Sequence, residues 1–477
     1  MKLSTRLLLV PLMPALLSAQ ALDRTQVPTL DKPPALKLPT LERASLPNGV
    51  TLQVVQQHEL PLVQLTLVIA GGTKLDGNQP GIASFTTRML TEGAGTRDAN
   101  ALQGELAFLG AQLFANAGTD AFTISLNVPK RTLGEALDLL GDVVLRPTFR
   151  SADVRRQRDL RLASILQRRD NANVLASLAF NQLVFPVGHP YHRPSDGDSA
   201  STAALDSAAV RTFYEQTFVP ERAKFIVVGD VTVPELRALL GRRFESWTRG
   251  TSGRTMAAVT AKPVVNSAVK IYLVDKPSAA QSVIYLGAPG AERLSPDYPA
   301  LMVMNTILGG SFSSRLNANL RETKGYTYGI SSRFSWAPLA GPFVVSTSVR
   351  TSVTDSSLIE IFKELKMIRD LAVDATELER AKAYVALGVP QRFETNSQIA
   401  SQLVELGFFS LPLASLGDFI AKVNQVTAAD VQRVARQYLP ETNATLVVVG
   451  DIAKIRPGIE ALKLGNITVL DAGQVAR

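Results

Sequence analysis

Alternating and continuous apolar positions divide the chain into short predicted strands and helices. A turn signal at residues 48–49 precedes two predicted strands, over residues 50–56 and 62–69. Residues 111–128 alternate as a hairpin around residues 118–120. Apolar residues recur at helical spacing in four further stretches, over residues 81–92, 99–109, 133–144 and 152–183.

The second half of the chain repeats this order of elements. "FVPERAKFIVVGDV" at residues 218–231 corresponds to "YLPETNATLVVVGDI" at residues 438–452, and each predicts a buried strand that ends at Gly-Asp. Strands over 269–274 and 281–288 and a helix near Pro299 then match the opening of the first half. The pattern predicts an internal duplication. Because each half mixes hairpins with helices and lacks regular βαβ alternation, the predicted class is α+β.

The predicted organisation has six segments. They are a signal peptide over residues 1–21, an extended N-terminal segment over 22–45, a first half over 46–249, a linker rich in Gly, Ser and Thr over 250–267, a second half over 268–457 and a C-terminal tail over 458–477.

The N-terminus resembles a cleaved export signal. Lys2 and Arg6 precede an apolar run that ends at small residues near Ala21. No later stretch has the ~20 apolar residues of a membrane span. We therefore expect a periplasmic protein without stable membrane insertion.

Composition narrows the possible chemistry. The 477 residues are 46% hydrophobic and include no cysteine, which excludes disulfides, thiolate zinc sites and a cysteine nucleophile. The net charge is +8, and an arginine-rich stretch covers residues 154–169. A solvated helix surface is the favoured interpretation over an acidic partner or a nucleic acid, since no aromatic residues are interleaved with the arginines. No nucleic-acid partner is expected.

The predicted helix "PGIASFTTRML", residues 80–90, has a divided surface. Its apolar residues share one face, whereas Ser84, Thr87 and Arg88 lie on another at the spacing that metal-binding helices use for their ligands. Serine, threonine and arginine hold metal poorly, and the guanidinium of Arg88 stays protonated.

Several segments in a fixed order resemble peptidase family M16, the zinc peptidases that include insulin-degrading enzyme, the mitochondrial processing peptidase and pitrilysin. The resemblance rests on "LPNGVTLQVV", "PGIASFTTRML", "FVPERAKFIVVGD" and "LGGSFSSRLNANLRETKGYTYG", together with the duplication. It implies two homologous α/β halves that form a clamshell around a chamber.

Active members of the family carry His-x-x-Glu-His on the helix that corresponds to residues 81–92. Two histidines hold zinc, the glutamate between them is the general base, and a distant glutamate completes the site. The corresponding residues here are Ser84, Thr87 and Arg88, and the distant glutamate falls near Ser164. All the ligands and the base are missing, so we expect neither a catalytic residue nor a metal or other cofactor on this chain.

The chain has three histidines, and two of them form a His-x-x-His pair in "GHPYHRPSDGD". His189 and His192 stand close in sequence to Asp196 and Asp198, but Pro190 breaks helical geometry. A structural loop is the favoured interpretation over a metal site. An active zinc peptidase with unusual ligands is accordingly the least favoured function.

Two features of the family's substrate-binding apparatus remain. Arg321 near a helix end and Tyr328 on the next predicted strand match the Arg and Tyr that hold a substrate carbonyl in M16 members. Asn116 and Ala117 match an edge strand that pairs with substrate peptide. The alternatives are that Arg321 is a surface helix residue, that Tyr328 is a packed strand residue and that Asn116 and Ala117 belong to an ordinary strand.

The resemblance implies a catalytically silent subunit of an M16 metallopeptidase. Such a chain would bind peptide substrates and form a heterodimer with a His-x-x-Glu-His subunit, and zinc is expected on that partner. The alternative is a stand-alone periplasmic protein that binds peptides or assists assembly without hydrolysis.

Overall fold

The computed structural model describes residues 36–248, 254–255 and 259–476. The predicted signal peptide and part of the predicted linker lie outside the described residues, and the segment boundaries stay predictions. From Lys37 onward the chain forms one compact unit. No helix among the described residues has the length and hydropathy needed to cross a membrane.

Each half of the chain contributes one six-stranded sheet. The first sheet has the order β1 (Glu42–Ser45), β2 (Thr51–Gln56), β8 (Ala223–Gly229), β3 (Leu62–Ala70), β7 (Ala121–Pro129) and β6 (Gln112–Ala117). The second has the order β14 (Asn466–Leu470), β9 (Lys270–Asp275), β13 (Thr445–Gly450), β10 (Gln281–Pro289), β12 (Pro342–Arg350) and β11 (Thr327–Phe334).

The topology confirms the duplication. In the first sheet β2 runs parallel to β8, and in the second sheet β9 runs parallel to β13 in the same way. The remaining pairs of these five strands are antiparallel in both sheets. Only the outer strand differs, since β1 is antiparallel to β2 whereas β14 is parallel to β9. The predicted α+β class with two similar halves is therefore confirmed.

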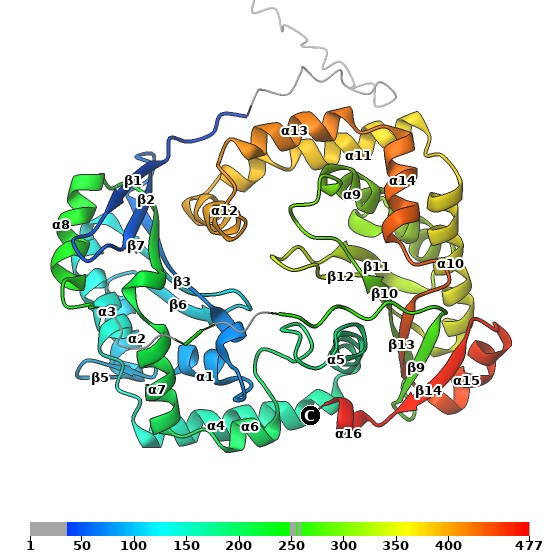
Figure 1. The fold of residues 1–477 in the computed structure, drawn as a ribbon, viewed down its shortest axis with the longest axis horizontal. Coiled ribbons are helices and arrows are strands. Elements are labelled where there is room, and N and C mark those ends of the chain that lie inside the picture. Colours follow the sequence, from blue (N-terminus) through cyan, green and yellow to red (C-terminus); the bar gives the residue numbers. More distant parts are fainter. Residues whose placement is uncertain (1–35, 249–253, 256–258, 477) are drawn as a thin grey trace, which may run out of the picture. The chain divides into compact units, whose positions relative to one another are not determined.

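Helices flank the sheets in both halves (Figure 1). Those of the first half are α1 (Ile82–Met89), α2 (Ala99–Phe108), α3 (Leu133–Leu145), α4 (Ser151–Gln167), α5 (Ala172–Val184), α6 (Ser199–Ala203), α7 (Ser207–Thr217) and α8 (Val233–Phe244). Those of the second half are α9 (Tyr298–Asn305), α10 (Thr354–Asp370), α11 (Ala375–Leu387), α12 (Asn396–Phe408), α13 (Ser415–Gln425), α14 (Ala428–Tyr438), α15 (Ile452–Ala461) and α16 (Ala472–Val475).

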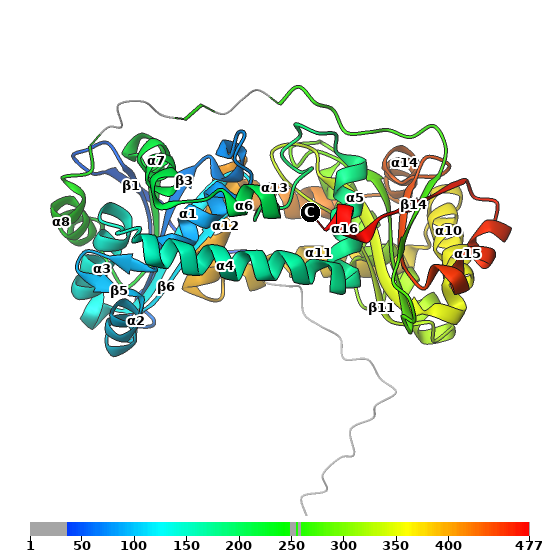
Figure 2. The same ribbon diagram turned by 90° about the horizontal axis from the view of Figure 1, so that it is seen from below.

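The single helical stretch predicted over residues 152–183 is wrong in one respect, because it is two helices. Asn171 leaves the helical conformation, and its side chain accepts hydrogen bonds from the backbone of Asn173 at 3.0 Å and Val174 at 3.3 Å. This cap starts a new helix. As a result α5 turns away from α4 (Figure 2).

The two halves exchange a helix. α5, from the first half of the chain, packs on β10 and β13 of the second sheet, while α12 packs on β3 and β8 of the first sheet. Buried apolar side chains fill both contacts, and Phe180 and Leu403 are examples. Asn396 and Ser397 of α12 also hydrogen-bond to β3, the first through its side-chain amide to the Leu62 carbonyl. Each sheet thus depends on a helix from the other half.

Candidate functional site

Helix α1 begins at a backbone turn that a buried carboxylate caps. Gly81, at φ +84°, precedes the helix, and the carboxylate of Asp76 accepts from the backbone N–H groups of Gly81 and Ala83, both at 2.9 Å. Burial raises the pKa of Asp76 to about 6, against the lowering effect of these hydrogen bonds. The apolar face is buried as predicted, and it consists of Ile82, Phe85 and Met89.

The polar residues of α1 are engaged within the helix itself. Ser84 Oγ donates to the Gly81 carbonyl at 3.1 Å, and Thr87 Oγ1 donates to the Ala83 carbonyl at 2.8 Å. Thr87 is only 1% exposed. Arg88 projects to solvent and pairs with Glu92, one turn on, at 3.3 Å. These residues are used for local structure and leave no set of metal-binding groups on α1.

Arg161 of α4 is the side chain that reaches α1. Its Nη1 donates to Ser84 Oγ at 3.1 Å and to the Gly81 carbonyl at 3.0 Å, and its guanidinium lies 4.9 Å from the centre of the Phe85 ring. Burial lowers the pKa of Arg161 to about 10, so it stays charged at neutral pH. A cation beside Ser84 opposes binding of a second cation there, so these residues do not fit zinc.

Ser164, in the position predicted for the distant ligand, lies one turn beyond Arg161 on α4. It is exposed, and no described residue hydrogen-bonds to its side chain. Sequence reasoning missed Arg161, although its spacing of one helical turn from residue 164 was a usable signal. The solvated surface predicted for the arginine-rich stretch is also wrong for Arg168, which is 7% exposed, donates to the Gly197 carbonyl and pairs with Asp196.

The loop with the His-x-x-His pair uses its side chains for structure. His189 is buried, stacks on Phe185 at 4.5 Å and accepts from the backbone N–H of Tyr191 at 3.2 Å. His192 Nδ1 donates to the Phe185 carbonyl at 2.7 Å. Burial lowers the pKa of His189. Asp198 caps α6 through the backbone of Ser201.

No group of three His, Asp or Glu side chains suited to a metal ion occurs among the residues that the structure describes.

Arg321 lies in a π-helical segment, Asn317–Thr323, that leads into β11. The segment is fixed to this strand because Asn317 exchanges two hydrogen bonds with the backbone of Ile330, at 2.8 and 3.2 Å. The guanidinium of Arg321 lies 4.3 Å from the centre of the Phe312 ring, and its Nε is 3.3 Å from Glu322. Phe312 is itself 67% exposed, so Arg321 lies at the surface of this half.

Tyr328 is the most exposed large hydrophobic side chain among the described residues, at 95%. It lies on the edge strand β11, in a bulge between Thr327 and Ile330 that shifts the pairing with β12. Thr327 fixes the bulge, since its Oγ1 accepts from the Gly329 N–H at 3.1 Å. No described residue hydrogen-bonds to the Tyr328 hydroxyl, and no contact joins it to Arg321 within the described part of the chain.

Asn116 and Ala117 end the edge strand β6 of the first sheet. They pair with Thr123 and Phe122 of β7 on one side, and β6 has no strand on its other side among the described residues. Phe114 on the same strand is 67% exposed. The backbone of this edge can accept an added strand.

Two family models match the chain, one in each half. Residues 53–183 match the model described as Insulinase (Peptidase family M16), and residues 204–385 match the one described as Peptidase M16 inactive domain. The chain belongs to peptidase family M16. The first match contains α1 with its missing ligands, and the second contains Arg321 and Tyr328.

Relatives of M16 type cover most of the chain. An uncharacterized zinc protease of Mycobacterium leprae is 27% identical over 83% of this chain and 89% of its own length. The protein called Non-peptidase homolog YmxG, of Helicobacter pylori, is 22% identical over 84% of this chain and 91% of its own.

Solved structures agree in fold. The peptidase M16 inactive domain from Pseudomonas fluorescens, 28% identical, has a TM-score of 0.78 and covers 86% of this chain and 98% of its own. A protease from Helicobacter pylori, 19% identical, has a TM-score of 0.80 over 87% of this chain and 100% of its own. With Ser84, Thr87 and Arg88 in place of His-x-x-Glu-His, the chain is a catalytically inactive member of the M16 family.

Proposed function

We propose that this chain is the non-catalytic subunit of a heteromeric M16 peptidase of the periplasm. It binds peptide and supplies Arg321 and Tyr328 to the active site of a partner subunit that carries His-x-x-Glu-His and the zinc ion. The observation that carries the proposal is the contrast between an α1 whose polar groups are locally engaged and a Tyr328 that is 95% exposed without an intramolecular role.

The chemistry of the pair supports this assignment. A guanidinium and a phenolic hydroxyl are both donors to a carbonyl oxygen that acquires negative charge during peptide hydrolysis. Tyr328 contributes almost no buried area to its own fold, so stability does not explain an aromatic residue there. Gly325, at φ +62°, makes the turn between the segment that carries Arg321 and the strand that carries Tyr328.

The free edge of β6 supports peptide binding. Backbone pairing requires no particular side chain, so an edge strand can hold peptides of varied sequence. Asn116 and Ala117 are the residues of β6 assigned to this contact. Zinc belongs to the partner in this proposal, and the export signal at residues 1–21 supports the periplasm as the compartment.

The test is capture of the native complex from periplasm with the tagged full chain. We expect a His-x-x-Glu-His subunit in equimolar amount, with zinc that stays on that subunit when the two are separated. Peptidase activity should appear only in the recombined mixture. A partner that is fully active alone would contradict the proposal.

The stand-alone alternative predicts a different result in the same experiment. The chain would bind unfolded peptides as a monomer or homodimer and would recover no peptidase. Zinc bound in stoichiometric amount by the isolated chain would instead favour an active enzyme with unusual ligands.

A further inference from the structure

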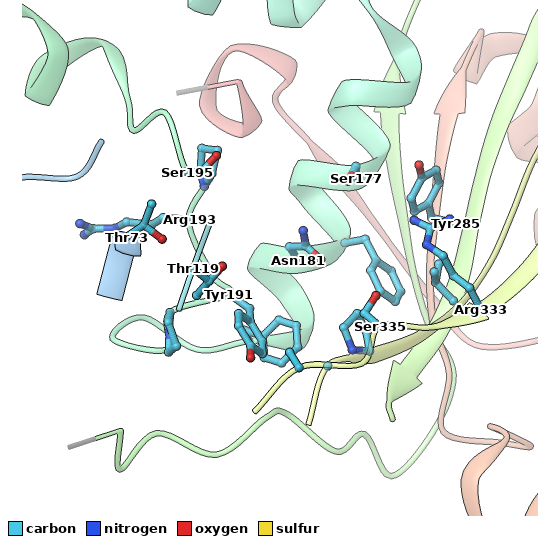
Figure 3. Close-up of a pocket in the computed structure, with 18 residues that line it drawn as sticks. Thr73, Thr119, Ser177, Asn181, Tyr191, Arg193, Ser195, Tyr285, Arg333 and Ser335 are labelled. Carbon is cyan, nitrogen blue, oxygen red and sulfur yellow. The ribbon is translucent and has the colours of Figure 1, made fainter. Parts of the chain in front are cut away.

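A polar cavity of about 400 Å³ lies beside α5, outside the residues assigned above (Figure 3). α5 supplies Ser177 and Asn181 to its lining, and the second sheet supplies Tyr285 from β10 and Arg333 from β11. The loop after α5 adds Arg193. The cavity therefore has a wall on a sheet and a wall on a helix that packs on that sheet.

The charge of this cavity is positive and uncompensated. Two arginines line it, and its lining includes no aspartate or glutamate. Arg333 makes one long hydrogen bond, from Nη1 to Ser346 Oγ at 3.4 Å, and Arg193 makes no hydrogen bond or ion pair with any described residue. Figure 3 shows them at opposite ends of the cavity, Arg193 beside Thr73 and Arg333 beside Tyr285.

Neutral donors near Arg333 are also free. The side chains of Ser177, Asn181 and Ser335 line the cavity and make no hydrogen bond within the described part of the chain, and the same holds for the hydroxyl of Tyr285. Polar groups that line a cavity without protein partners are available to a ligand.

The strand register aims Arg333 into this space. Arg333 pairs with Val344 of β12, and directly opposed residues of an antiparallel pair share a face. Val344 belongs to the apolar cluster that contains Phe180 of α5. Arg333 therefore projects from the face of the second sheet that α5 covers in part.

Arg333 also stands on the strand that carries Tyr328. Both lie on β11, and an extended chain advances about 3.3 Å per residue, so the two positions are at most about 16 Å apart along the strand, and the bulge at Tyr328 shortens this distance. A peptide whose carbonyl meets Tyr328 reaches Arg333 about five residues away. The spacing relates the cavity to the peptide-binding surface.

We propose that this cavity binds a peptide carboxylate about five residues from the bond held at Arg321 and Tyr328, with Arg333 as its main partner. The planar guanidinium matches a carboxylate in a two-pronged pair, and Asn181 and Tyr285 add neutral donors. The carboxylate is either an acidic side chain or the C-terminus of the peptide. This inference rests on the proposed function, since it names the class of peptide that the surface prefers.

The test measures binding of labelled peptides to the full chain by fluorescence anisotropy. The ten-residue peptides have an acetylated N-terminus and an amidated C-terminus, and they carry either one Glu or one Gln near one end. One further Gln peptide keeps a free C-terminal carboxylate. We expect a peptide with a carboxylate to bind about tenfold more tightly than its neutral counterpart, the effect of one charge-assisted hydrogen bond. Comparison of the Glu peptides with the Gln peptide that has a free C-terminus shows whether the bound carboxylate is an acidic side chain or the C-terminus.

Matched variants assign the effect to the cavity. Arg333→Gln should abolish the preference, and Arg193→Gln should reduce it. Arg350→Gln removes the same charge from an exposed residue of the neighbouring strand β12 and should leave the preference unchanged. Because Arg333 is exposed, its replacement should not alter the melting temperature.

Equal affinity for charged and neutral peptides would overturn the inference, as would an equal loss of preference in Arg333→Gln and Arg350→Gln. A different result would contradict the proposed function. This result is that Arg321→Ala leaves cleavage of a neutral peptide by the heteromer unchanged.

Discussion

Two regions of this chain, α1 in the first half and the segment from Arg321 to Tyr328 in the second, differ in how their polar side chains are engaged. In the first half, Ser84 and Thr87 donate to carbonyls of their own helix, and Arg161 fills the space beside them. In the second half, Tyr328 projects from an edge strand and Arg321 lies at the surface beside the exposed Phe312. The polar side chains of the first region hydrogen-bond within the protein, whereas the side chains of the second region lie at the surface.

The proposed function assigns the role toward another molecule to the second of these regions. The polar groups on α1 are explained by the fold, because the hydroxyls of Ser84 and Thr87 are satisfied by carbonyls of their own helix. The exposure of Tyr328 is not explained by the fold, since it packs on almost nothing. Substitutions can test whether the side chains of α1 are needed for stability and whether Arg321 and Tyr328 act on a partner.

Restoring the glutamate of the family motif should have the largest effect on stability. Thr87→Glu introduces a carboxylate where the side chain is 1% exposed, and we expect a loss of about 4 kcal/mol in the free energy of unfolding. Urea denaturation measures it. The control Thr91→Glu, on the exposed end of the same segment, should change stability by about 0.5 kcal/mol or less. A loss below about 1 kcal/mol for Thr87→Glu would show that α1 can accommodate a carboxylate at this buried position.

The cap of α1 should give stability a pH dependence. The pKa of Asp76 is raised to about 6 in the folded chain from 3.8, so the folded state binds the proton more tightly than the unfolded state. The stability that this group contributes is complete below pH 3.8 and is lost as the pH rises through 6. Relative to Asp76→Asn, the wild-type chain should lose up to about 3 kcal/mol between pH 4 and pH 7.

Asp98→Asn is the matched control for this measurement, because Asp98 caps α2 at an exposed position through the Ala101 N–H. The same series of unfolding measurements on this variant shows which effects are common to helix caps. A constant difference between the wild-type chain and Asp76→Asn across this pH range would contradict the assignment.

Removing the cation beside Ser84 should have a smaller effect. Arg161→Met keeps the apolar stem but removes the charged donor to Ser84 Oγ and to the Gly81 carbonyl, at a cost of about 2 kcal/mol. Arg155→Met, on an exposed position of α4, should be nearly neutral. Thermal and urea unfolding of both variants measure the difference, and equal stabilities would show that Arg161 does not hold α1 in place.

The periodic parts of the fold could be predicted from the sequence. β2, β3 and the β6–β7 hairpin coincide with predicted strands. Alternation marks β7, one face of which is more buried than the other, whereas β3 is buried on both faces. The duplication was also visible, since the strands that end at Gly229 and Gly450 have the same flanking residues.

Long-range contacts of polar residues could not be predicted. Arg161 and Arg168 belong to a stretch whose spacing is typical of a solvated helix, but α1 covers Arg161 and the loop at residues 196–197 covers Arg168. The break at Asn171 depends on a side-chain cap that no periodicity signals. The cavity at Arg333 combines residues from α5, β10 and β11, which are distant in sequence.

The most direct measurement of the central claim is the peptidase rate of the zinc-bearing partner as this chain is added. The wild-type chain should raise the rate to saturation at one chain per partner. Arg321→Ala should reduce kcat about a hundredfold, and Tyr328→Phe should also reduce it, as expected for loss of a donor to a developing oxyanion. The controls Arg380→Ala and Tyr384→Phe, exposed residues of α11, should behave as the wild type. Full activation by Arg321→Ala, or a partner that needs no second chain, would contradict the account.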